Sequence, residues 1–248
     1  MGRRRFYAPP EAFSAQSQTA TLEAEEARHL REVLRLKPGD EVFVFDGAGK
    51  EFRCTVETSR RESAALNVLE EVDPPHPESS LELTLAVALL KSDKFDLVVQ
   101  KATELGVSRV VPVMTKLADI KLKDESDANK RVTRWRRIGM EAAKQSGRAL
   151  IPEIAMPVAF ADLISALAAN DRRVLFSERD GAPFDSLDHK VGPITALVGS
   201  EGGWTTDELD AAKTAGWKLI TLGGRTLRAE TAAIAVATLL QHRFGDLN

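Results

Sequence analysis

Residues 194–203 read Ile-Thr-Ala-Leu-Val-Gly-Ser-Glu-Gly-Gly, an apolar strand pattern that runs directly into a glycine-rich loop. The same transition recurs in residues 218–231, which read Lys-Leu-Ile-Thr-Leu-Gly-Gly-Arg-Thr-Leu-Arg-Ala-Glu-Thr. Ligands of open α/β sheets bind beyond the carboxyl ends of the strands, and glycine lets backbone groups approach a ligand closely. Two glycine loops at successive strand ends therefore predict one ligand site that is built largely from backbone.

The loops also argue against two common kinds of nucleotide site. Neither has the GxGxxG fingerprint of dinucleotide-binding enzymes or the GxxxxGK[ST] sequence of a phosphate-binding loop. A nucleotide-dependent oxidoreductase therefore lacks motif support. Arg228 and Glu230 stand beside the second loop, and ionisable side chains at a pocket are candidates for chemistry. For either loop taken alone, an ordinary turn is the simpler interpretation.

The sequence around these loops alternates between strand and helix patterns. Alternation of this kind predicts a mostly parallel sheet with helices on both faces. The expected strands cover 81–90, 109–113, 172–176, 194–198 and 218–222. The expected helices cover 93–105, 127–147, 159–169, 206–215 and 229–243.

The first part of the chain has a different, β-rich pattern. Residues 41–45 and 51–56 predict a hairpin around a glycine-containing turn, and 64–72 predict another strand. A helix over 24–35 should end at the turn Lys37-Pro38-Gly39-Asp40. Residues 74–77 hold three prolines, which continue neither a helix nor a sheet. We therefore predict a domain over 1–73, a proline-rich linker over 74–80 and a second domain over 81–248.

The composition of the 248 residues is typical of a soluble globular protein, with 43% hydrophobic and 29% charged residues. No apolar run is long enough to cross a bilayer, and no apolar segment follows the basic start MGRRRFYAPP. We therefore expect a cytoplasmic protein. The single cysteine, Cys54, lies in a strand pattern, so we expect a small buried residue rather than a reactive thiol. The four histidines show no metal-ligand spacing, so we expect no metal site.

Positive charge is gathered into patches, although the net formal charge is −3. That total argues against a uniformly basic surface that coats nucleic acid. Residues 130–148 hold seven basic side chains and one acid, a local charge of +6, and residues 3–5 form a second cluster. An ordinary solvated face is the alternative, but the one-sided charge favours a structured polyanion. Helical spacing places four of these residues on one polar stripe: Arg137, Glu141, Lys144 and Arg148.

Several motifs along the chain, in a fixed order, carry a family resemblance. The C-terminal ones are Leu197-Val-Gly-Ser-Glu-Gly-Gly-Trp204, Leu222-Gly-Gly-Arg-Thr-Leu-Arg-Ala-Glu-Thr-Ala232 and His242-Arg-Phe-Gly-Asp246. Matches further upstream lie within residues 89–96, 100–107 and 134–152, and N-terminal ones within 29–40 and 45–47. Together they resemble the RsmE family of ribosomal RNA uridine-N3 methyltransferases, of the SPOUT superfamily, over nearly the whole chain. One position departs from the family pattern, because Ser200 stands where the family usually has proline.

The resemblance implies a fold, a cofactor and a partner. The fold would be a SPOUT-type α/β domain with a mostly parallel sheet and a C-terminal trefoil knot, preceded by a small PUA-like β-barrel that binds RNA. The cofactor would be S-adenosyl-L-methionine, bound near the interface of a homodimer. The substrate would be one uridine near the decoding region of 16S ribosomal RNA in the small ribosomal subunit.

The resemblance also assigns residues to the site. For catalysis, Glu230 is our candidate base and Arg228 our candidate for stabilising charge, because the uridine N3 proton must leave and the resulting negative charge needs a stabilising group. The alternative for Glu230 is an acid at a helix N-terminus that the helix dipole favours. Ser177 and Glu178 would form a third wall of the pocket. The expected cofactor-binding residues are Leu197, Gly199, Glu201, Gly202, Leu222, Gly223, Leu227, Arg228, Thr231 and Ala232. The expected RNA contacts, mainly to phosphates, are Arg5, Lys91, Lys94, Lys101, Arg134, Arg137 and Arg148.

Two other functions remain open from the sequence. The chain could be a SPOUT methyltransferase that acts on another RNA or on a ribose 2′-hydroxyl, and the modified nucleoside would distinguish these. It could instead be an RNA-binding or ribosome-assembly protein without turnover, in which case it would not bind the cofactor.

Overall fold

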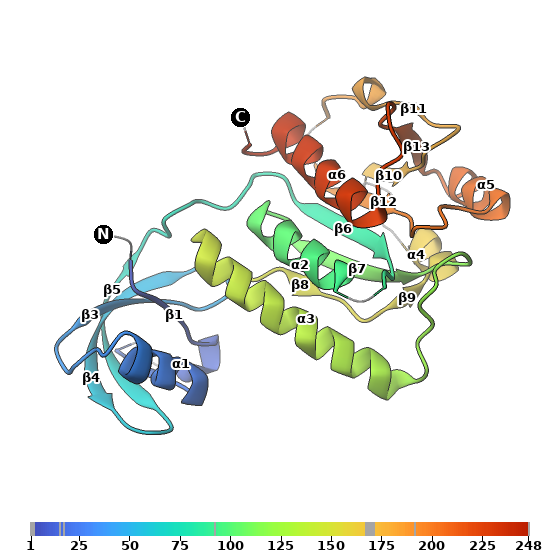
Figure 1. Cartoon of the computed structure of the whole chain (residues 1–248). Coiled ribbons are helices and arrows are strands. Elements are labelled where there is room, and N and C mark those ends of the chain that lie inside the picture. The colour runs from blue at the N-terminus through green and yellow to red at the C-terminus, as the bar shows by residue number, and fades with distance from the viewer. Residues whose placement is uncertain are drawn as a thin grey trace. The chain divides into compact units, whose positions relative to one another are not determined.

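The computed structural model describes residues 3–14, 16, 18–91, 93–166, 172–190 and 192–247 (Figure 1). The chain divides into two compact units. Unit 1 comprises Met1–Glu78 and Met140–Ile151, and unit 2 comprises Ser79–Gly139 and Pro152–Asn248. The long helix α3 (Glu125–Ser146) therefore begins in unit 2 and ends in unit 1.

Unit 2 is built on an eight-stranded sheet whose described pairings are all parallel. The strand order is β11-β13-β10-β12-β6-β7-β8, with β9 also paired to β7. The carboxyl ends of β10, β12 and β13 consequently meet at one edge of the sheet. The strands are β6 (Leu83–Ala88), β7 (Arg109–Met114), β8 (Glu153–Ile154), β9 (Val158–Ala159), β10 (Arg172–Phe176), β11 (Ala182–Pro183), β12 (Ile194–Val198) and β13 (Lys218–Thr221).

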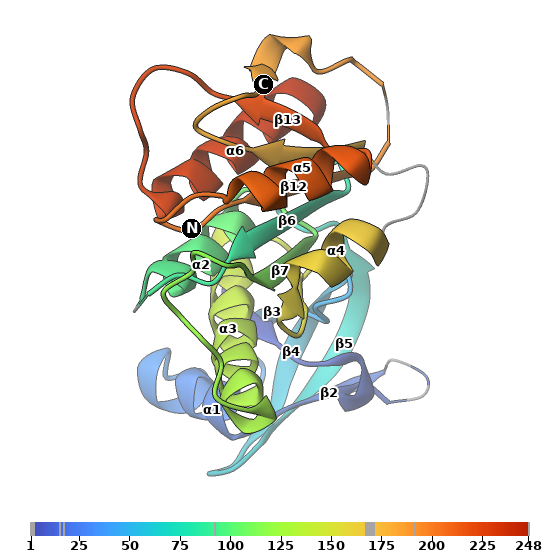
Figure 2. The same ribbon diagram turned by 90° about the vertical axis from the view of Figure 1, so that its right-hand side faces the viewer.

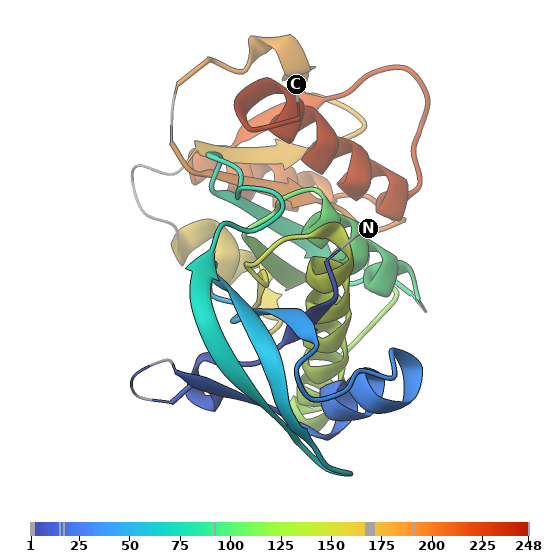
Figure 3. The ribbon, with the colours of Figure 1, turned by 90° about the vertical axis from the view of Figure 1, so that its left-hand side faces the viewer.

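Helices cover both faces of this sheet because successive side chains of each strand point to opposite faces. Leu83, Leu85 and Val87 pack with α2 (Lys94–Glu104), α6 (Ala229–Phe244) and the first half of α3. Ala86 belongs to a second core with α4 (Phe160–Ala166) and α5 (Thr206–Thr214). Figure 2 shows α4 and α5 in front of the sheet, and Figure 3 shows α6 on the opposite side.

Unit 1 contains a five-stranded sheet in the order β1-β3-β4-β5-β2. All its pairings are antiparallel except that of β1 with β3. Register shifts interrupt the β4–β5 pairing, and bulges of this kind increase strand bending and twist, which is visible in Figure 3. The strands are β1 (Arg5–Tyr7), β2 (Thr19–Leu22), β3 (Glu41–Phe45), β4 (Glu51–Ser59) and β5 (Ala64–Val72).

The predicted elements agree with the structure most closely where an apolar run is sharply bounded. The strands expected over 64–72, 172–176 and 194–198 have those bounds. The helix expected over 24–35 is shorter: α1 (Ala24–Arg28) continues as a π-helical segment, His29–Val33, and Arg35 has a φ of 52°. Of the helix expected over 159–169, residues 167–169 lie outside the described residues. The short strands β1, β2, β8, β9 and β11 were not predicted.

The remaining helical segments are short. Two 3₁₀ turns occur among the described residues, Pro10–Ala12 in unit 1 and Phe184–Ser186 in unit 2. In the described part of the chain, no helix has the length and apolar character needed to span a membrane.

Candidate active site

The ends of β10, β12 and β13 enclose a cavity of about 160 Å³ within unit 2. Because β10 pairs with both β12 and β13, the three segments that follow these strands are brought together. The first helical turns of α6 supply the remaining wall. The lining residues are Phe176, Ser177, Glu178, Val198, Gly199, Ser200, Gly203, Trp204, Thr221, Leu222, Gly223, Gly224, Arg225, Thr226, Leu227, Ala229, Ala232 and Val236.

The loop after β12 is a tight turn that favours glycine at two positions. Gly203 donates its N–H to the Ser200 carbonyl at 2.9 Å and has a φ of 67°. A Cβ at Gly203 would lie only 3.0 Å from a carboxylate oxygen of Glu178, and one at Gly199 would lie 3.1 Å from the Trp204 ring. The Trp204 indole N–H donates to the Phe176 carbonyl at 2.9 Å, which ties this loop to the end of β10.

The loop after β13 uses glycine for backbone conformation rather than for space. Gly223 and Gly224 have φ values of 75° and 73°, and a Cβ at either would meet no atom within 4 Å. The charged residues among those that line the cavity are Glu178 and Arg225. Apolar and backbone walls with one group of each charge fit a ligand that combines a flat ring with an amino-acid moiety, as adenosylmethionine does.

The predicted cofactor-binding residues divide into two groups. Five of them line the cavity: Gly199, Leu222, Gly223, Leu227 and Ala232. Ser177 and Glu178 also line it, as expected for a third wall. The remaining residues do not line it: Leu197, Glu201, Gly202, Arg228 and Thr231.

Two of the residues outside the cavity support its loops from behind. Leu197 is fully buried in the core between the sheet and α5. Gly202 packs against the loop that follows β7, where an added Cβ would lie 2.9 Å from both the Cβ and the carbonyl oxygen of Leu117. Trp204, Arg225 and Thr226 also line the cavity. All three lie within the motifs quoted above, but no role in the pocket was predicted for them.

The two predicted catalytic residues lie at the start of α6. Arg228 is the N-cap residue of this helix, and its exposed guanidinium has no partner among the described residues. The side chain of Glu230 is 12% exposed, with Oε2 3.6 Å from the ammonium of Lys94. Oε2 itself is buried and accepts no hydrogen bond from the described residues.

Lys94 also forms a shorter bond, at 2.7 Å, to Glu201 Oε1. This hydrogen bond raises the pKa of Lys94. Burial alone would raise the pKa of Glu201, but the hydrogen bond and charge of Lys94, together with a backbone hydrogen bond, lower it. Both groups are therefore held in their charged forms.

Four of the predicted RNA-binding residues have side chains that are at least partly exposed to solvent. Lys91 pairs with Asp119 at 2.7 Å, Lys101 pairs with Glu104 at 2.8 Å, and Arg134 pairs with Asp96. The Arg134 side chain is 67% exposed despite this pair. Arg137 lies on the same helix and is exposed.

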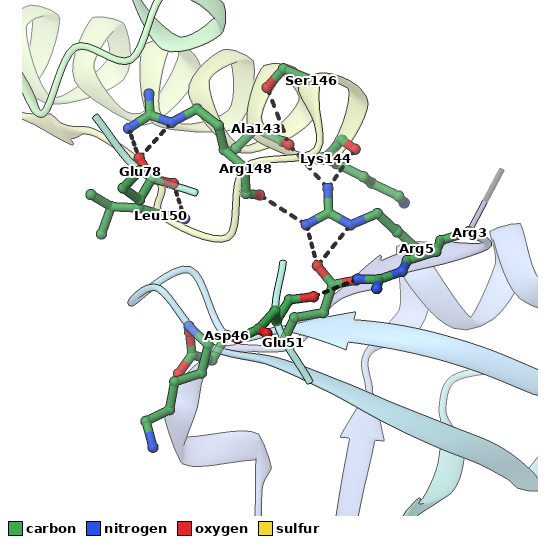
Figure 4. Close-up of polar contacts among 12 residues, drawn as sticks. Arg3, Arg5, Asp46, Glu51, Glu78, Ala143, Lys144, Ser146, Arg148 and Leu150 are labelled. Carbon is green, nitrogen blue, oxygen red and sulfur yellow. Dashed lines mark hydrogen bonds and ion pairs between the residues drawn. The ribbon is translucent and has the colours of Figure 1, made fainter. Parts of the chain in front are cut away.

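Arg5 is buried inside unit 1, in contrast to the phosphate contact predicted for it. Its Nε and Nη2 donate to Glu51, and its Nη1 and Nη2 donate to the carbonyls of Ala143, Lys144 and Arg148 (Figure 4). A guanidinium has five N–H groups, and here all five are used. A phosphate could reach Arg5 only after these bonds break.

Arg148 is likewise internal, and the predicted polar stripe does not extend to it. Helix α3 ends at Ser146, so Arg148 is not a helical residue. Its Nε and Nη2 donate to Glu78 at 2.9 and 2.7 Å (Figure 4). Lys144, on the predicted stripe, pairs with Glu26 at 2.6 Å.

The comparisons with known proteins first define a class. Residues 77–241 match the model of an RNA methyltransferase domain, and residues 22–69 match that of an RNA methyltransferase PUA domain. The chain therefore combines these two domain types, and the predicted mostly parallel α/β domain preceded by a PUA-like domain is confirmed.

The relatives then narrow the class to one family. A ribosomal RNA small subunit methyltransferase E from Synechocystis sp. is 33% identical over 245 residues, which cover 96% of this chain and 77% of the relative. The corresponding protein of Rickettsia conorii is 31% identical, with 83% and 82% covered. The chain belongs to the ribosomal RNA small subunit methyltransferase E family, as its motifs predicted.

A solved structure of this family has the same fold. The Neisseria gonorrhoeae ribosomal RNA small subunit methyltransferase E, bound to S-adenosyl methionine, matches with a TM-score of 0.90 and 32% identity, and the match covers 100% of both chains.

Proposed function

We propose that this chain is an enzyme that transfers a methyl group from S-adenosyl-L-methionine to N3 of one uridine in the 16S ribosomal RNA of the small ribosomal subunit. The observation that carries this proposal is the glycine-lined cavity at the ends of β10, β12 and β13. It lies in a chain whose full length matches a family member bound to S-adenosyl methionine. The uridine and its N3 atom come from the family resemblance.

Within this proposal the cofactor is held mainly by loop backbone. Gly199, Leu222 and Gly223 would present N–H and C=O groups, and Leu227 and Ala232 would form apolar walls. Leu197, Glu201, Gly202 and Thr231 would shape these loops from outside the cavity. The bound cofactor supplies a methyl group on a positively charged sulfur, and correct positioning of the attacking atom provides much of the rate.

The chain itself must deal with the uridine N3 proton. Glu230 is the proposed acceptor, because its Oε2 has no hydrogen-bond donor among the described residues. Arg228 is the proposed group that stabilises negative charge on the uracil, because its guanidinium is exposed and unpaired within the described residues. Proton acceptance and charge stabilisation are both needed before the imide nitrogen becomes an effective nucleophile.

The proposal extends to the RNA and to the assembly. Lys91, Lys101, Arg134 and Arg137 would contact phosphates, and these contacts would weaken as salt rises. The active form would be a cytoplasmic homodimer that uses no metal. Its C-terminal segment would form a trefoil knot, and its domains would divide into 1–73 and 81–248 around the linker 74–80.

Methyl transfer from labelled adenosylmethionine to small ribosomal subunits, with nucleoside analysis of the product, tests this function. We expect N3-methyluridine at one site, lost in Glu230→Gln and retained in Glu153→Gln, a matched change at an exposed glutamate on β8. A 2′-O-methylated nucleoside, or transfer to a different RNA only, would overturn the proposed substrate. Absence of cofactor binding by calorimetry would overturn the enzymatic assignment and favour an RNA-binding protein.

A further inference from the structure

Lys94 connects two segments that lie far from it in the sequence. It is the first residue of α2, and its Nζ lies 2.7 Å from Glu201 Oε1 and 3.6 Å from Glu230 Oε2. Its side chain is only 30% exposed. A lysine placed between two carboxylates in this way differs from the exposed phosphate contact that the sequence predicted for it.

Each of the two carboxylates belongs to a segment that lines the cavity, although neither residue lines it itself. Glu201 lies in the tight turn between Ser200 and Gly203, both of which line the cavity. Glu230 lies in the first turn of α6, between the lining residues Ala229 and Ala232. The ammonium of Lys94 therefore joins the glycine loop after β12 to the helix that follows the glycine loop after β13.

The Oε2 atom of Glu230 is the unusual member of this group. It is buried and accepts no hydrogen bond from the described residues, and the Lys94 ammonium, 3.6 Å away, forms an ion pair with it at a distance too long for a hydrogen bond. Buried acceptors without a donor are uncommon in folded proteins and call for an explanation. A donor on the substrate that reaches this oxygen once the neighbouring side chains move aside would supply one.

We propose that Lys94 is a positioning residue, which holds Glu230 as the acceptor of the uracil N3 proton and fixes the glycine loop through Glu201. This inference rests on the proposed function. In the reaction, the N3 proton passes to Glu230 while the N3–methyl bond forms and the sulfur–methyl bond breaks, with the electron pair left on sulfur. Glu230 then releases its proton to water.

The charges around this group set the expected pH dependence. Glu230 faces Lys94, which faces Glu201, and Asp119 acts on Glu201 and is itself paired with Lys91 at 2.7 Å. Removing the Lys94 cation makes the charged form of Glu230 less favourable, since an opposite charge within about 4–6 Å favours ionisation. The rate should then require a higher pH to reach its plateau.

The test compares Lys94→Met, Lys94→Arg and Lys91→Met, with Lys91 as the matched exposed lysine. For each variant, kcat is measured against pH with small ribosomal subunits, and RNA affinity is measured against salt. We expect Lys94→Met to lower kcat about 100-fold and to move the acidic limb of the pH profile to higher pH. Lys94→Arg should restore most of both. The salt dependence of RNA binding should be unchanged in Lys94→Met, but its slope should fall by about 1 in Lys91→Met.

A double variant tests whether Lys94 acts through Glu230 or independently of it. If Lys94 acts through Glu230, adding Lys94→Met to Glu230→Gln should lower kcat no further. An unchanged acidic limb in Lys94→Met, together with a salt slope reduced as in Lys91→Met, would identify Lys94 as a phosphate contact and overturn the inference. Absence of N3-methyluridine with the unsubstituted chain would instead overturn the proposed function, a result distinct from either outcome for Lys94.

Discussion

The buried polar cluster of unit 1 and the rim of the cavity in unit 2 use the same residue types in opposite ways. In unit 1, Glu51 is fully buried and accepts hydrogen bonds from Arg3 and Arg5, and every N–H of Arg5 is paired. In unit 2, Arg228 is unpaired among the described residues and Glu230 Oε2 accepts no hydrogen bond there.

The difference shows how to separate structural from functional charges in this protein. A fully satisfied network rigidifies the fold, and one that lacks a partner has capacity left for a ligand. The number of unmet hydrogen bonds thus distinguishes Arg228 from Arg5. The sequence alone placed both at the RNA, Arg5 as a phosphate contact and Arg228 as a group that stabilises charge on the uracil.

The largest expected effect comes from removing Glu51. Glu51→Ala leaves Arg5 buried without its counter-ion, and breaking a buried pair in this way costs about 3–5 kcal/mol. The free energy of unfolding from denaturant titration measures the loss. Glu41→Ala is the control, because Glu41 pairs with Arg53 at the surface and such pairs contribute about 0–1 kcal/mol. Equal losses in the two variants would contradict the structural assignment of the cluster.

Arg228→Ala should give the converse result. We expect kcat to fall by roughly 10²–10³-fold, the effect of removing one charge-stabilising donor, while the free energy of unfolding stays within about 0.5 kcal/mol. Arg109→Ala, which removes an exposed arginine paired with Glu153, should preserve both quantities. A large loss of stability in Arg228→Ala with a normal kcat would show that Arg228 has a structural role and not a catalytic one.

A smaller effect is expected from Gly223→Ala. The added methyl group meets no atom, so the only penalty is the φ of 75°, which costs a non-glycine residue about 1–2 kcal/mol. The loop can relieve this strain by leaving the conformation that holds the cofactor, so adenosylmethionine affinity should fall about tenfold, equivalent to about 1.4 kcal/mol, by calorimetry. Gly216→Ala carries the same kind of penalty, at a φ of 84° and in open space away from the cavity, and should lower stability without changing cofactor affinity. Equal cofactor affinities in the two variants would contradict the role of the loop.

The smallest expected effect concerns Cys54. Burial raises the pKa of the Cys54 thiol to about 12, so the reactive thiolate is scarce near neutral pH. We expect no measurable labelling of the native protein by a thiol reagent at pH 7.5, and complete labelling in denaturant. Rapid labelling of the native protein would show that the core of unit 1 opens.

The sequence predicted those parts of the fold that local patterns determine. β10 and β12 are short apolar runs with clear ends, so their bounds could be assigned from the residues alone. β8, β9 and β11 have two residues each, too few to show any periodicity. The break of the first helix at a π-helical segment likewise has no local signal.

Those parts of the candidate site that depend on local motifs could be predicted from the sequence, whereas those that depend on contacts between distant residues could not. Gly199 and Gly223 were recognised because a glycine loop after a strand is a local motif. The partners of Lys94 and Arg148 lie 107 and 70 residues away along the chain, and no spacing rule relates such residues. Only the folded structure distinguishes these two basic residues from the exposed ones.

The discontinuity of unit 1 has a consequence for synthesis of the protein. The carbonyl acceptors that complete the hydrogen bonding of Arg5 belong to residues 143, 144 and 148, within the segment Met140–Ile151 of that unit. Domains generally fold in order from the N-terminus as the chain emerges from the ribosome. Here the first unit to be translated cannot be completed until residue 151 has emerged, by which time the opening strands of unit 2 are already outside. A chimera or truncation that takes only the N-terminal segment would leave Arg5 with Glu51 and without its three carbonyl acceptors.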